Sequence, residues 1–401
     1  MDLRDDAEGM REELTLLRRE LHREPETGLQ LPRTQEKVLA ALQGLPLEIS
    51  TGSALTSVTA VLRGGGPHTG GGPRPVVLLR GDMDALPVTE ETGEEFTSRV
   101  EGVMHACGHD LHTAGLVGAA RLLCAHRDQL PGDVVFMFQP GEEGHDGAGA
   151  MLEEGVLEAA GRTVDAAYGL HVFSSGCPAD TFVSRPGPLM AAADGLFVRV
   201  EGKGGHGSKP HVALDPVPAA CEMVTALQTL TTRRFDVFDP VVITVGEFHA
   251  GTQRNIIPDT ARFNATVRSF SHEARERVRE LALPLCHRIA EAHGLRAEVV
   301  FGGEQYPVTV NTPAEHEFAA ETVREVFGEE RFHHLADPLT GAEDFSRVLE
   351  KVPGAFVFLD AAYPDGREPA YNHSPRAAFD DRVLPDASAL LAELAVRRLR
   401  R

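Results

Sequence analysis

Three short apolar segments, each followed by acidic residues or a histidine, constrain the fold of this chain most. They are VVLL at 76–79, VVFMF at 134–138 and DAAYGL at 165–170. Continuous apolar runs of this length suit strands that are buried on both faces, as in a parallel sheet. An apolar helix at 111–126 separates the first two runs. This order predicts an open α/β sheet, mixed but mostly parallel, with helices on both faces.

Polar side chains follow each of these predicted strands. They are Asp82 and Asp84 after the first, Glu142 and Glu143 after the second, and His171 after the third. A fourth apolar run, AFVFL at 355–359, leads toward His373 in YNHSP. Ligands of open α/β sheets bind beyond the carboxyl ends of the strands. We therefore expect one functional site at this edge of the sheet.

The middle of the chain has a different pattern. Its predicted elements are a strand at 196–202, a helix at 215–232, strands at 241–249 and 261–270, a helix at 272–293 and a strand at 296–302. The order βαββαβ is that of a ferredoxin-like unit. We therefore predict a domain at 188–305, inserted into a discontinuous domain of residues 1–187 and 306–401. The stretch VEGKGGHGSKPH, which contains His206, follows a strand that resembles an edge strand.

Charge and cysteine content exclude some classes of partner. The net charge of −21 disfavours binding to nucleic acids or to an anionic membrane. No window offers the ~18 apolar residues of a membrane helix, and the acidic N-terminus does not resemble a secretory signal. The five cysteines are scattered and odd in number, which disfavours a disulfide framework. We therefore predict a cytoplasmic protein.

The stretch GVMHACGHDLHTAG at 102–115 allows three interpretations. Cys107 and His109 lie two residues apart and could bind one metal ion. Gly108 and Asp110 fit the start of an ordinary helix equally well. A redox role for Cys107 is a third possibility, although no second cysteine lies nearby to form a disulfide.

The two adjacent glutamates, Glu142 and Glu143, could simply form a solvated acidic turn. Their place after a buried strand, in a glycine-rich bend, favours a functional role. One carboxylate could bind metal while its neighbour carries a proton.

Isolated histidines such as His171 and His373 are usually structural. Together with Cys107, His109 and Glu143, however, they supply five N, O and S groups, enough for two divalent ions that share ligands. The mixed set suits Zn²⁺, with Mn²⁺ or Co²⁺ as alternatives.

Taken together, nine segments resemble the metal-dependent aminoacylase and glutamate-carboxypeptidase family, in the amidohydrolase branch that includes hippurate hydrolases and indole-acetyl-amino-acid hydrolases. These segments are LHREPETG, RGDMDALPVTEETG, MHACGHDLHTA, FQPGEEGHDGAGAMLEEGVL, YGLHV, GKGGHGSKPH, RNIIPD, TGAEDF and NHSPRAAF. They extend over nearly the whole chain. The resemblance implies a fold like that of dinuclear-metal exopeptidases, with the insert as a lid and dimerisation domain.

The resemblance also assigns roles to individual residues. It implies metal ligands at Cys107, His109, Glu143, His171 and His373. Glu142 would be the catalytic base, Asp84 would orient a ligand, and His206 would contact the substrate and stabilise the oxyanion. Asn255, in RNIIPD, is a weaker candidate for binding the substrate carboxylate. Other branches of the family carry a metal-binding histidine where this chain has Asp82, so no ligand role is transferred to Asp82.

These observations predict an enzyme that uses two divalent ions to hydrolyse N-acyl amino acids. We expect a homodimer, or a tetramer, formed through the lid domain. Within hydrolases, a dipeptidase or carboxypeptidase and a deacetylase of an acetylated metabolite remain alternatives. Outside them, the alternatives are a metal- or ligand-binding relative without turnover and an oxidoreductase that uses Cys107.

Overall fold

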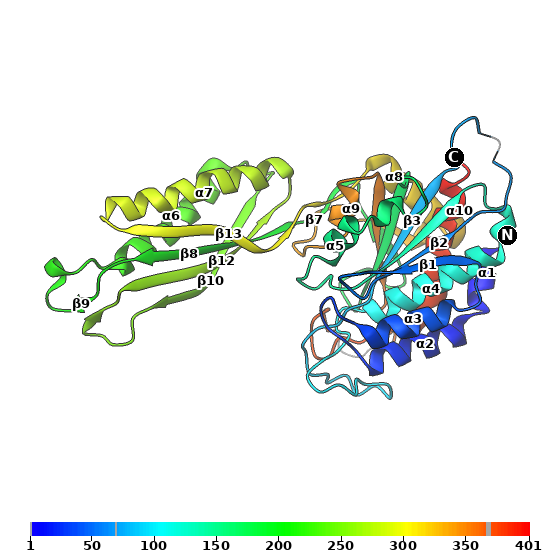
Figure 1. Ribbon diagram of the computed structural model, residues 1–401, viewed down its shortest axis with the longest axis horizontal. Helices are drawn as coiled ribbons and strands as arrows, with labels where there is room; N and C mark the ends of the chain where they lie inside the picture. The colour runs from blue at the N-terminus through cyan, green and yellow to red at the C-terminus, as the bar shows by residue number, and fades with distance from the viewer. Residues whose placement is uncertain (1, 69, 366–369) are drawn as a thin grey trace. The chain divides into compact units, whose positions relative to one another are not determined.

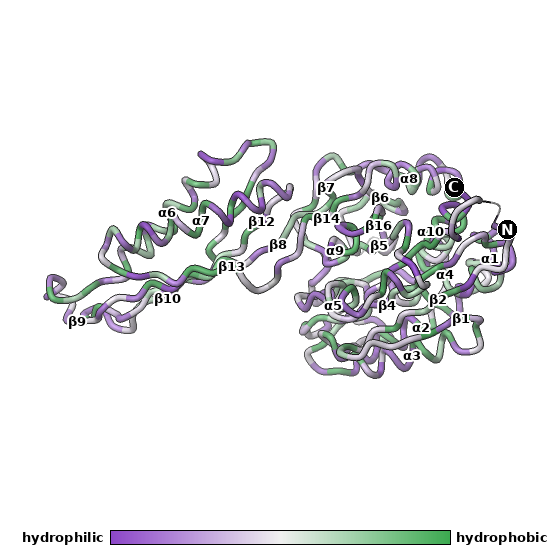
Figure 2. Tube along the Cα trace, turned by 45° about the horizontal axis from the view of Figure 1, so that its top comes forward, coloured by the Kyte–Doolittle hydropathy of each residue, from purple (hydrophilic) through white to green (hydrophobic). Residues whose placement is uncertain are grey.

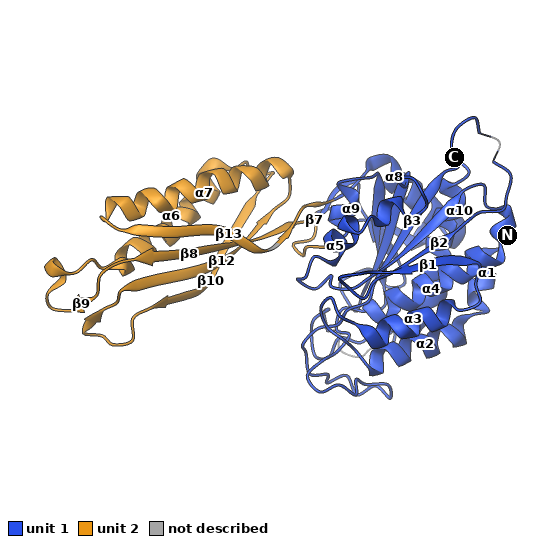
Figure 3. Cartoon of the chain, in the orientation of Figure 1, with its two compact units in different colours: residues 1–189, 310–337, 344–401 blue, residues 190–309, 338–343 orange. Residues whose placement is uncertain are grey.

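The structure is a computed structural model, which describes residues 2–68, 70–365 and 370–401. The chain divides into two compact units (Figure 3). The first comprises residues 1–189, 310–337 and 344–401, and the second comprises residues 190–309 and 338–343. The segment 338–343 belongs to the second unit, in which the Ala191 N–H donates to the Leu339 carbonyl at 2.9 Å. The domain predicted at 188–305 does not include this segment.

The first unit is built on an eight-stranded mixed sheet with the order β1-β2-β4-β3-β5-β16-β6-β15 (Figure 1). Its four central strands, β4, β3, β5 and β16, are parallel to one another. They contain the four apolar runs, and nearly all of their residues are buried. The predicted α/β sheet is therefore confirmed. The strands are β1 Leu47–Thr51, β2 Val58–Leu62, β3 Val76–Asp82, β4 Asp133–Gln139, β5 Ala166–Phe173, β6 Phe182–Ser184, β15 Phe332–His334 and β16 Gly354–Asp360.

Helices cover both faces of this sheet. On one face, α4 and α10 pack against each other and against β3 and β5, and Figure 2 shows apolar residues along α10. On the other face, α5 contacts β4 and the short helix α9. The helices of this unit are α1 Leu3–Glu8, α2 Arg11–Arg23, α3 Pro32–Leu42, α4 His109–Ala125, α5 Gly147–Glu153, α8 Pro313–Phe327, α9 Ser346–Leu349 and α10 Leu384–Arg398. A search of the described helices for a membrane-crossing segment finds none.

The second unit has the predicted ferredoxin-like order. Its antiparallel sheet runs β10-β12-β8-β13, and helices α6 and α7 pack against it and against each other. The elements are β8 Ala192–Glu201, α6 Pro216–Arg234, β10 Val241–Ala250, β12 Thr260–Ser269, α7 His272–Ala292 and β13 Arg296–Tyr306.

The interpretation of the first strand of this unit as an edge strand was wrong. Strand β8 lies inside the sheet and pairs with both β12 and β13. Its sequence looks like that of an edge strand because outward-facing polar residues alternate with buried ones. After β8, the chain forms a separate two-stranded ribbon, in which β9 Gly205–His206 pairs with β11 Ile256–Ile257.

Candidate metal centre

A tight turn before α4 sets the positions of Cys107 and His109. Between them, Gly108 adopts the left-handed conformation, with φ of 84°. A Cβ atom added at Gly108 would lie 2.4 Å from Cγ2 of Val172, so any other residue would force the turn or the Val172 side chain to shift. Glycine therefore allows the turn to pack directly against the end of β5, where His171 lies.

One ring nitrogen of His109 has no hydrogen-bond partner among the described residues. Its Nδ1 lies 2.9 Å from the backbone oxygen of Asp84, which can only accept, so Nδ1 carries the proton. Nε2 is buried, forms no hydrogen bond among the described residues and lies 3.6 Å from Oδ2 of Asp82. Burial lowers the pKa of His109, but Asp82 and Cys107 outweigh it and raise this pKa well above the ordinary value. The raised pKa favours a proton on Nε2, and a metal ion that displaces this proton meets a lone pair in surroundings that favour positive charge.

His171 presents a similar lone pair to Cys107. Its Nδ1 donates to the backbone oxygen of Val172 at 2.8 Å, and its Nε2 lies 3.4 Å from Sγ of Cys107. Burial, together with the neighbouring His112, holds the pKa of His171 well below its usual value. The imidazole is therefore neutral, the form that binds metals.

Glu143 and His373 complete the candidate set. His373 Nε2 lies 3.2 Å from Oε1 of Glu143, and hydrogen bonding with Cys107 and Glu143 raises the pKa of His373 to about 10. The backbone of His373 is in the left-handed region, with φ of 70°, and its N–H donates to Ala106 at 2.8 Å. This bond holds His373 beside the turn that carries Cys107.

The five predicted ligands lie together in overlapping groups. Cys107 forms one group with His109 and His171, and a second with Glu143 and His373. Within each group, the potential ligand atoms lie within 4.8 Å of one another. Glu142 and Glu143 form a third such group with His109. Because Cys107, Glu143 and His109 each belong to two groups, the geometry fits two ions that share ligands.

Asp84 fixes the loop that carries both glutamates. Its two carboxylate oxygens accept the backbone N–H groups of Glu142 and Glu143, each at 3.0 Å. Asp84 is buried, and its backbone oxygen also binds His109. It therefore connects the loop after β4 with the first turn of α4.

Asp82, His109 and His112 form another group of potential ligands. However, His112 uses both ring nitrogens within the protein, one with Asp82 at 2.5 Å and the other with the Val172 N–H at 2.8 Å. Asp82 also binds Arg80 at 2.5 Å. The protein itself therefore supplies partners for the atoms of Asp82 and His112 that could bind a cation.

Sequence analysis missed Asn372, whose side chain binds several parts of the site. Its amide group donates to the backbone oxygens of Cys107 at 3.3 Å and Val172 at 3.1 Å, and it accepts from Ser174. Its place beside His373 is the one signal in the sequence that could have identified it.

His206 and Asn255 lie in the second unit, on the ribbon formed by β9 and β11. The backbone oxygen of Asn255 accepts the Gly207 N–H at 2.8 Å, and both His206 and Asn255 are exposed. His206 Nδ1 accepts the Ser208 N–H at 3.1 Å. Since a backbone N–H can only donate, the neutral ring of His206 carries its proton on Nε2.

The sequence profile of peptidase family M20/M25/M40 matches residues 78–397. The chain belongs to this family. This M20/M25/M40 family member is 37% identical to thermostable carboxypeptidase 2 of Saccharolobus solfataricus, with 98% of each chain covered. It is 36% identical to IAA-amino acid hydrolase ILR1-like 4 of Arabidopsis thaliana, over 96% of this chain and 85% of the relative. It is 37% identical to N-acetylcysteine deacetylase of Bacillus subtilis, over 95% of each chain.

A solved structure of the M20 family also has this fold. It is the YXEP protein of Bacillus subtilis, described as a dinuclear metal-binding peptidase, with a TM-score of 0.81 and 34% identity. The match covers 98% of this chain and 99% of that one. The predicted family is therefore confirmed.

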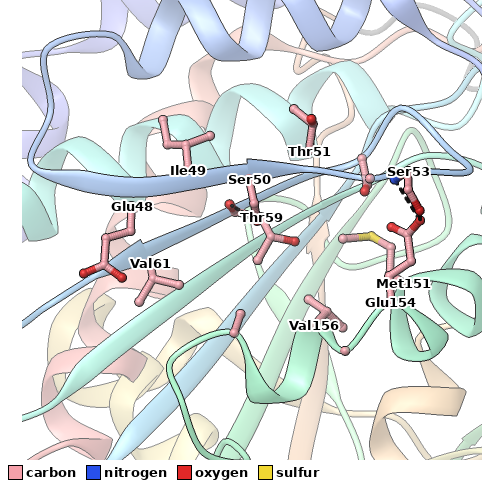
Figure 4. Close-up of a pocket in the computed structure, with 14 residues that line it drawn as sticks. Glu48, Ile49, Ser50, Thr51, Ser53, Thr59, Val61, Met151, Glu154 and Val156 are labelled. Carbon is pink, nitrogen blue, oxygen red and sulfur yellow. Dashed lines mark hydrogen bonds between the residues drawn. The ribbon is translucent and has the colours of Figure 1, made fainter.

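The same unit also contains a hollow of about 510 Å³ (Figure 4). Strands β1 and β2 and the segment from Met151 to Ala159 line it, and none of the predicted site residues does. One of its two acidic residues, Glu154, accepts hydrogen bonds from Ser53 and from the Ala54 N–H.

Proposed function

We propose that the protein is an amidohydrolase that uses two divalent ions to cleave N-acyl amino acids into a carboxylic acid and a free amino acid. The observation that carries the proposal is the overlap of the ligand groups, in which Cys107, Glu143 and His109 are each shared. The names of two relatives, an IAA-amino acid hydrolase and an N-acetylcysteine deacetylase, support this class of substrate.

The proposed ligands are Cys107, His109, Glu143, His171 and His373. Buried ligand atoms support two of them, since His109 Nε2 forms no hydrogen bond among the described residues and Glu143 Oε1 faces His373, another proposed ligand, at 3.2 Å. When bound, the ions would polarise the scissile carbonyl and lower the pKa of the attacking water. Zn²⁺ suits the thiolate and imidazole donors, and Mn²⁺ and Co²⁺ are alternatives.

Glu142 is the proposed general base. It removes the proton of the water during attack and returns a proton to the leaving nitrogen. Asp84 acts through the backbone of Glu142 and Glu143, so its proposed role is positioning rather than direct catalysis. Its two hydrogen bonds, each at 3.0 Å, support this role.

His206 is the proposed oxyanion donor. Its Nδ1 accepts from Ser208, so Nε2–H is available to donate to developing negative charge. Asn255, on the same ribbon, is proposed to bind the substrate carboxylate. In this proposal residues 188–305 form a lid and dimerisation domain, and the protein is a cytoplasmic homodimer or tetramer. The five free cysteines support the cytoplasmic assignment.

A second candidate activity is hydrolysis of peptides from the carboxyl end. The similarity to a thermostable carboxypeptidase, at 37% identity, favours it. Both activities use the same ligands and base and differ in whether an acyl group or a peptide precedes the scissile bond.

A hydrolysis screen tests the proposal. The chelator-treated protein is supplied with Zn²⁺, Mn²⁺ or Co²⁺ and offered acetyl-, benzoyl-, indole-acetyl- and aminobenzoyl-amino acids and dipeptides. We expect hydrolysis of an N-acyl amino acid that is lost with the chelator and restored by a metal. Full activity in metal-free protein would refute the mechanism, and activity on peptides alone would select the second candidate.

A further inference from the structure

We propose that His112 is a positioning residue that holds the candidate ligand His171 through the backbone of Val172. This inference rests on the proposed function, since it concerns how a metal ligand is oriented. His112 lies on α4, one turn after His109, and is buried. It touches neither the substrate nor the reacting atoms in this proposal.

His112 lies just beyond the point where the pairing of β3 with β5 ends. Strands β3 and β5 pair in parallel up to Arg80 and Gly169, and their register ends there. Beyond that point, the ring of His112 bridges the two strands. It binds Asp82 at the end of β3 and the N–H of Val172 on β5.

The hydrogen-bond directions in this bridge are determined by its partners. The backbone N–H of Val172 can only donate, so Nε2 of His112 accepts and Nδ1 carries the proton. Nδ1 then donates to the carboxylate of Asp82 at 2.5 Å. His112 is therefore neutral and has no lone pair left for a metal ion.

The backbone of Val172, which His112 holds through the N–H, in turn binds the ring of His171. Its carbonyl accepts from Nδ1 of His171 at 2.8 Å and from the side chain of Asn372 at 3.1 Å. The rings of His112 and His171 also pack edge to face, with centroids 4.6 Å apart. The peptide groups on both sides of Val172 are thus held, which leaves Nε2 of His171 directed at Cys107.

The other end of the bridge is anchored in the core. Arg80 binds Asp82 at 2.5 Å and Asp344 at 3.0 Å, and its side chain is fully buried. The charge of Asp82 is matched by Arg80, and in this proposal Asp82 holds the proton of His112.

Three variants of His112 separate hydrogen bonding from ring packing. In His112→Gln, the amide nitrogen and oxygen are bonded to one carbon, as the two ring nitrogens of histidine are. The amide can therefore donate to Asp82 and accept from the Val172 N–H. His112→Phe keeps the ring and loses both bonds, whereas His112→Asn is too short to reach both partners. His316→Phe is the matched control, since His316 is also buried and lies on α8.

Two readouts other than activity are measured. The first is Co²⁺ affinity by chelator competition, together with the thiolate-to-cobalt absorption band. The second is hydrogen exchange at the Val172 amide in metal-free protein. Loss of a group that orients a metal ligand typically costs ~10–100-fold in affinity. We expect this loss, with faster Val172 exchange, in His112→Phe and His112→Asn. We expect near-normal values in His112→Gln and His316→Phe.

The outcomes distinguish this proposal from the function it rests on. Wild-type Co²⁺ affinity and exchange in both His112→Phe and His112→Asn would overturn the positioning role. Equal losses in His112→Gln and His112→Phe would also overturn it, because the hydrogen bonds would then not matter. If the wild-type protein binds no metal, the proposed function fails, and Val172 exchange still decides whether His112 holds this strand. If His112→Phe does not fold, His112→Asn, which can still bind Asp82, provides the comparison.

Discussion

The backbone N–H of Glu142 donates to the carboxylate of Asp84 at 3.0 Å, and the next N–H in the chain binds the second oxygen of the same group. One buried side chain thus fixes the backbone of the candidate base and of a candidate ligand together. Carboxylates suit this task because both of their oxygens accept hydrogen bonds.

Asp84→Asn should therefore impair metal binding and catalysis together. The amide can accept from one N–H, but its own NH₂ group faces the other. We expect a loss of ~10–100-fold in metal affinity and a lower rate at saturating metal. Chelator competition and rate measurements on the same samples test this. A normal affinity and rate would show that Asp84 does not hold the loop.

Glu142→Gln and Glu143→Gln should have different effects. Glutamine at 142 cannot accept the proton of the water, so the rate should fall by at least ~10²–10⁴-fold with metal content unchanged. Glutamine at 143 should instead lower metal content. Elemental analysis beside kcat separates the two variants. The reverse pattern would mean that the base and the ligand are interchanged.

Cys107→Ala should bind metal poorly, since it removes a donor shared by two ligand groups. In the wild-type protein, metal should also protect Cys107 from thiol reagents. Cys124→Ala is the matched control because Cys124 lies on α4, the helix that follows Cys107, and is half-buried and outside the ligand groups. Normal metal content and activity in Cys107→Ala would restore the interpretation of this stretch as an ordinary helix start.

His206→Ala should lose ~10²-fold or more in rate, as expected for an oxyanion donor, with metal content unchanged. Mixing it with Glu142→Gln tests whether His206 serves the active site of a partner subunit. Activity returns in hybrid dimers only if the two residues act across the interface. If subunits exchange and no activity returns, His206 acts within its own chain or has no catalytic role.

Arg18→Met should destabilise the first unit strongly. Arg18 is buried and binds Asp110 at 2.7 Å and Asp381 at 3.1 Å. Removing one partner of a buried ion pair costs ~3–5 kcal/mol of unfolding free energy. Arg19→Met is the control, because the half-exposed Arg19 binds the same Asp381 and should cost only ~0–1 kcal/mol.

The same substitution should change the response to acid. Burial raises the pKa of Asp110, but Arg18 and His22 outweigh it and hold this pKa far below the ordinary value. A depressed carboxyl pKa stabilises the fold above the unfolded pKa of ~3.9, and this contribution is lost as the pH falls. Arg18→Met should lose less stability on acidification. Urea unfolding of chelator-treated protein from about pH 7 to 3 measures this, and an unchanged acid response would contradict it.

The sequence predicted the parts of this structure that depend on local patterns. The buried strands are continuous apolar runs, and their carboxyl ends meet at one edge. The presence of His171 and Glu143 in ligand groups that share Cys107 therefore followed from topology. The elements of the inserted unit also lie close to their predicted bounds.

The features that were missed depend on contacts between distant segments. The local sequence does not show that β8 has a neighbouring strand on both sides. Buried and exposed residues alternate in an inner strand of a sheet with one exposed face, just as they do in an edge strand. Nor could the sequence show that both nitrogens of His112 are occupied. That depends on Asp82 and Val172, 30 and 60 positions away in the chain.

Completion of the ligand set also takes time during protein synthesis. Asn372, which precedes His373 and binds Cys107, lies 265 positions after it. At ~5–20 residues per second, a ribosome needs roughly 13–50 s to make the chain between them. Throughout that interval, the thiol of Cys107 exists without His373, while the inserted unit is being translated. The nascent protein therefore passes through a stage in which its most oxidisable candidate ligand is already present but its metal centre cannot yet close.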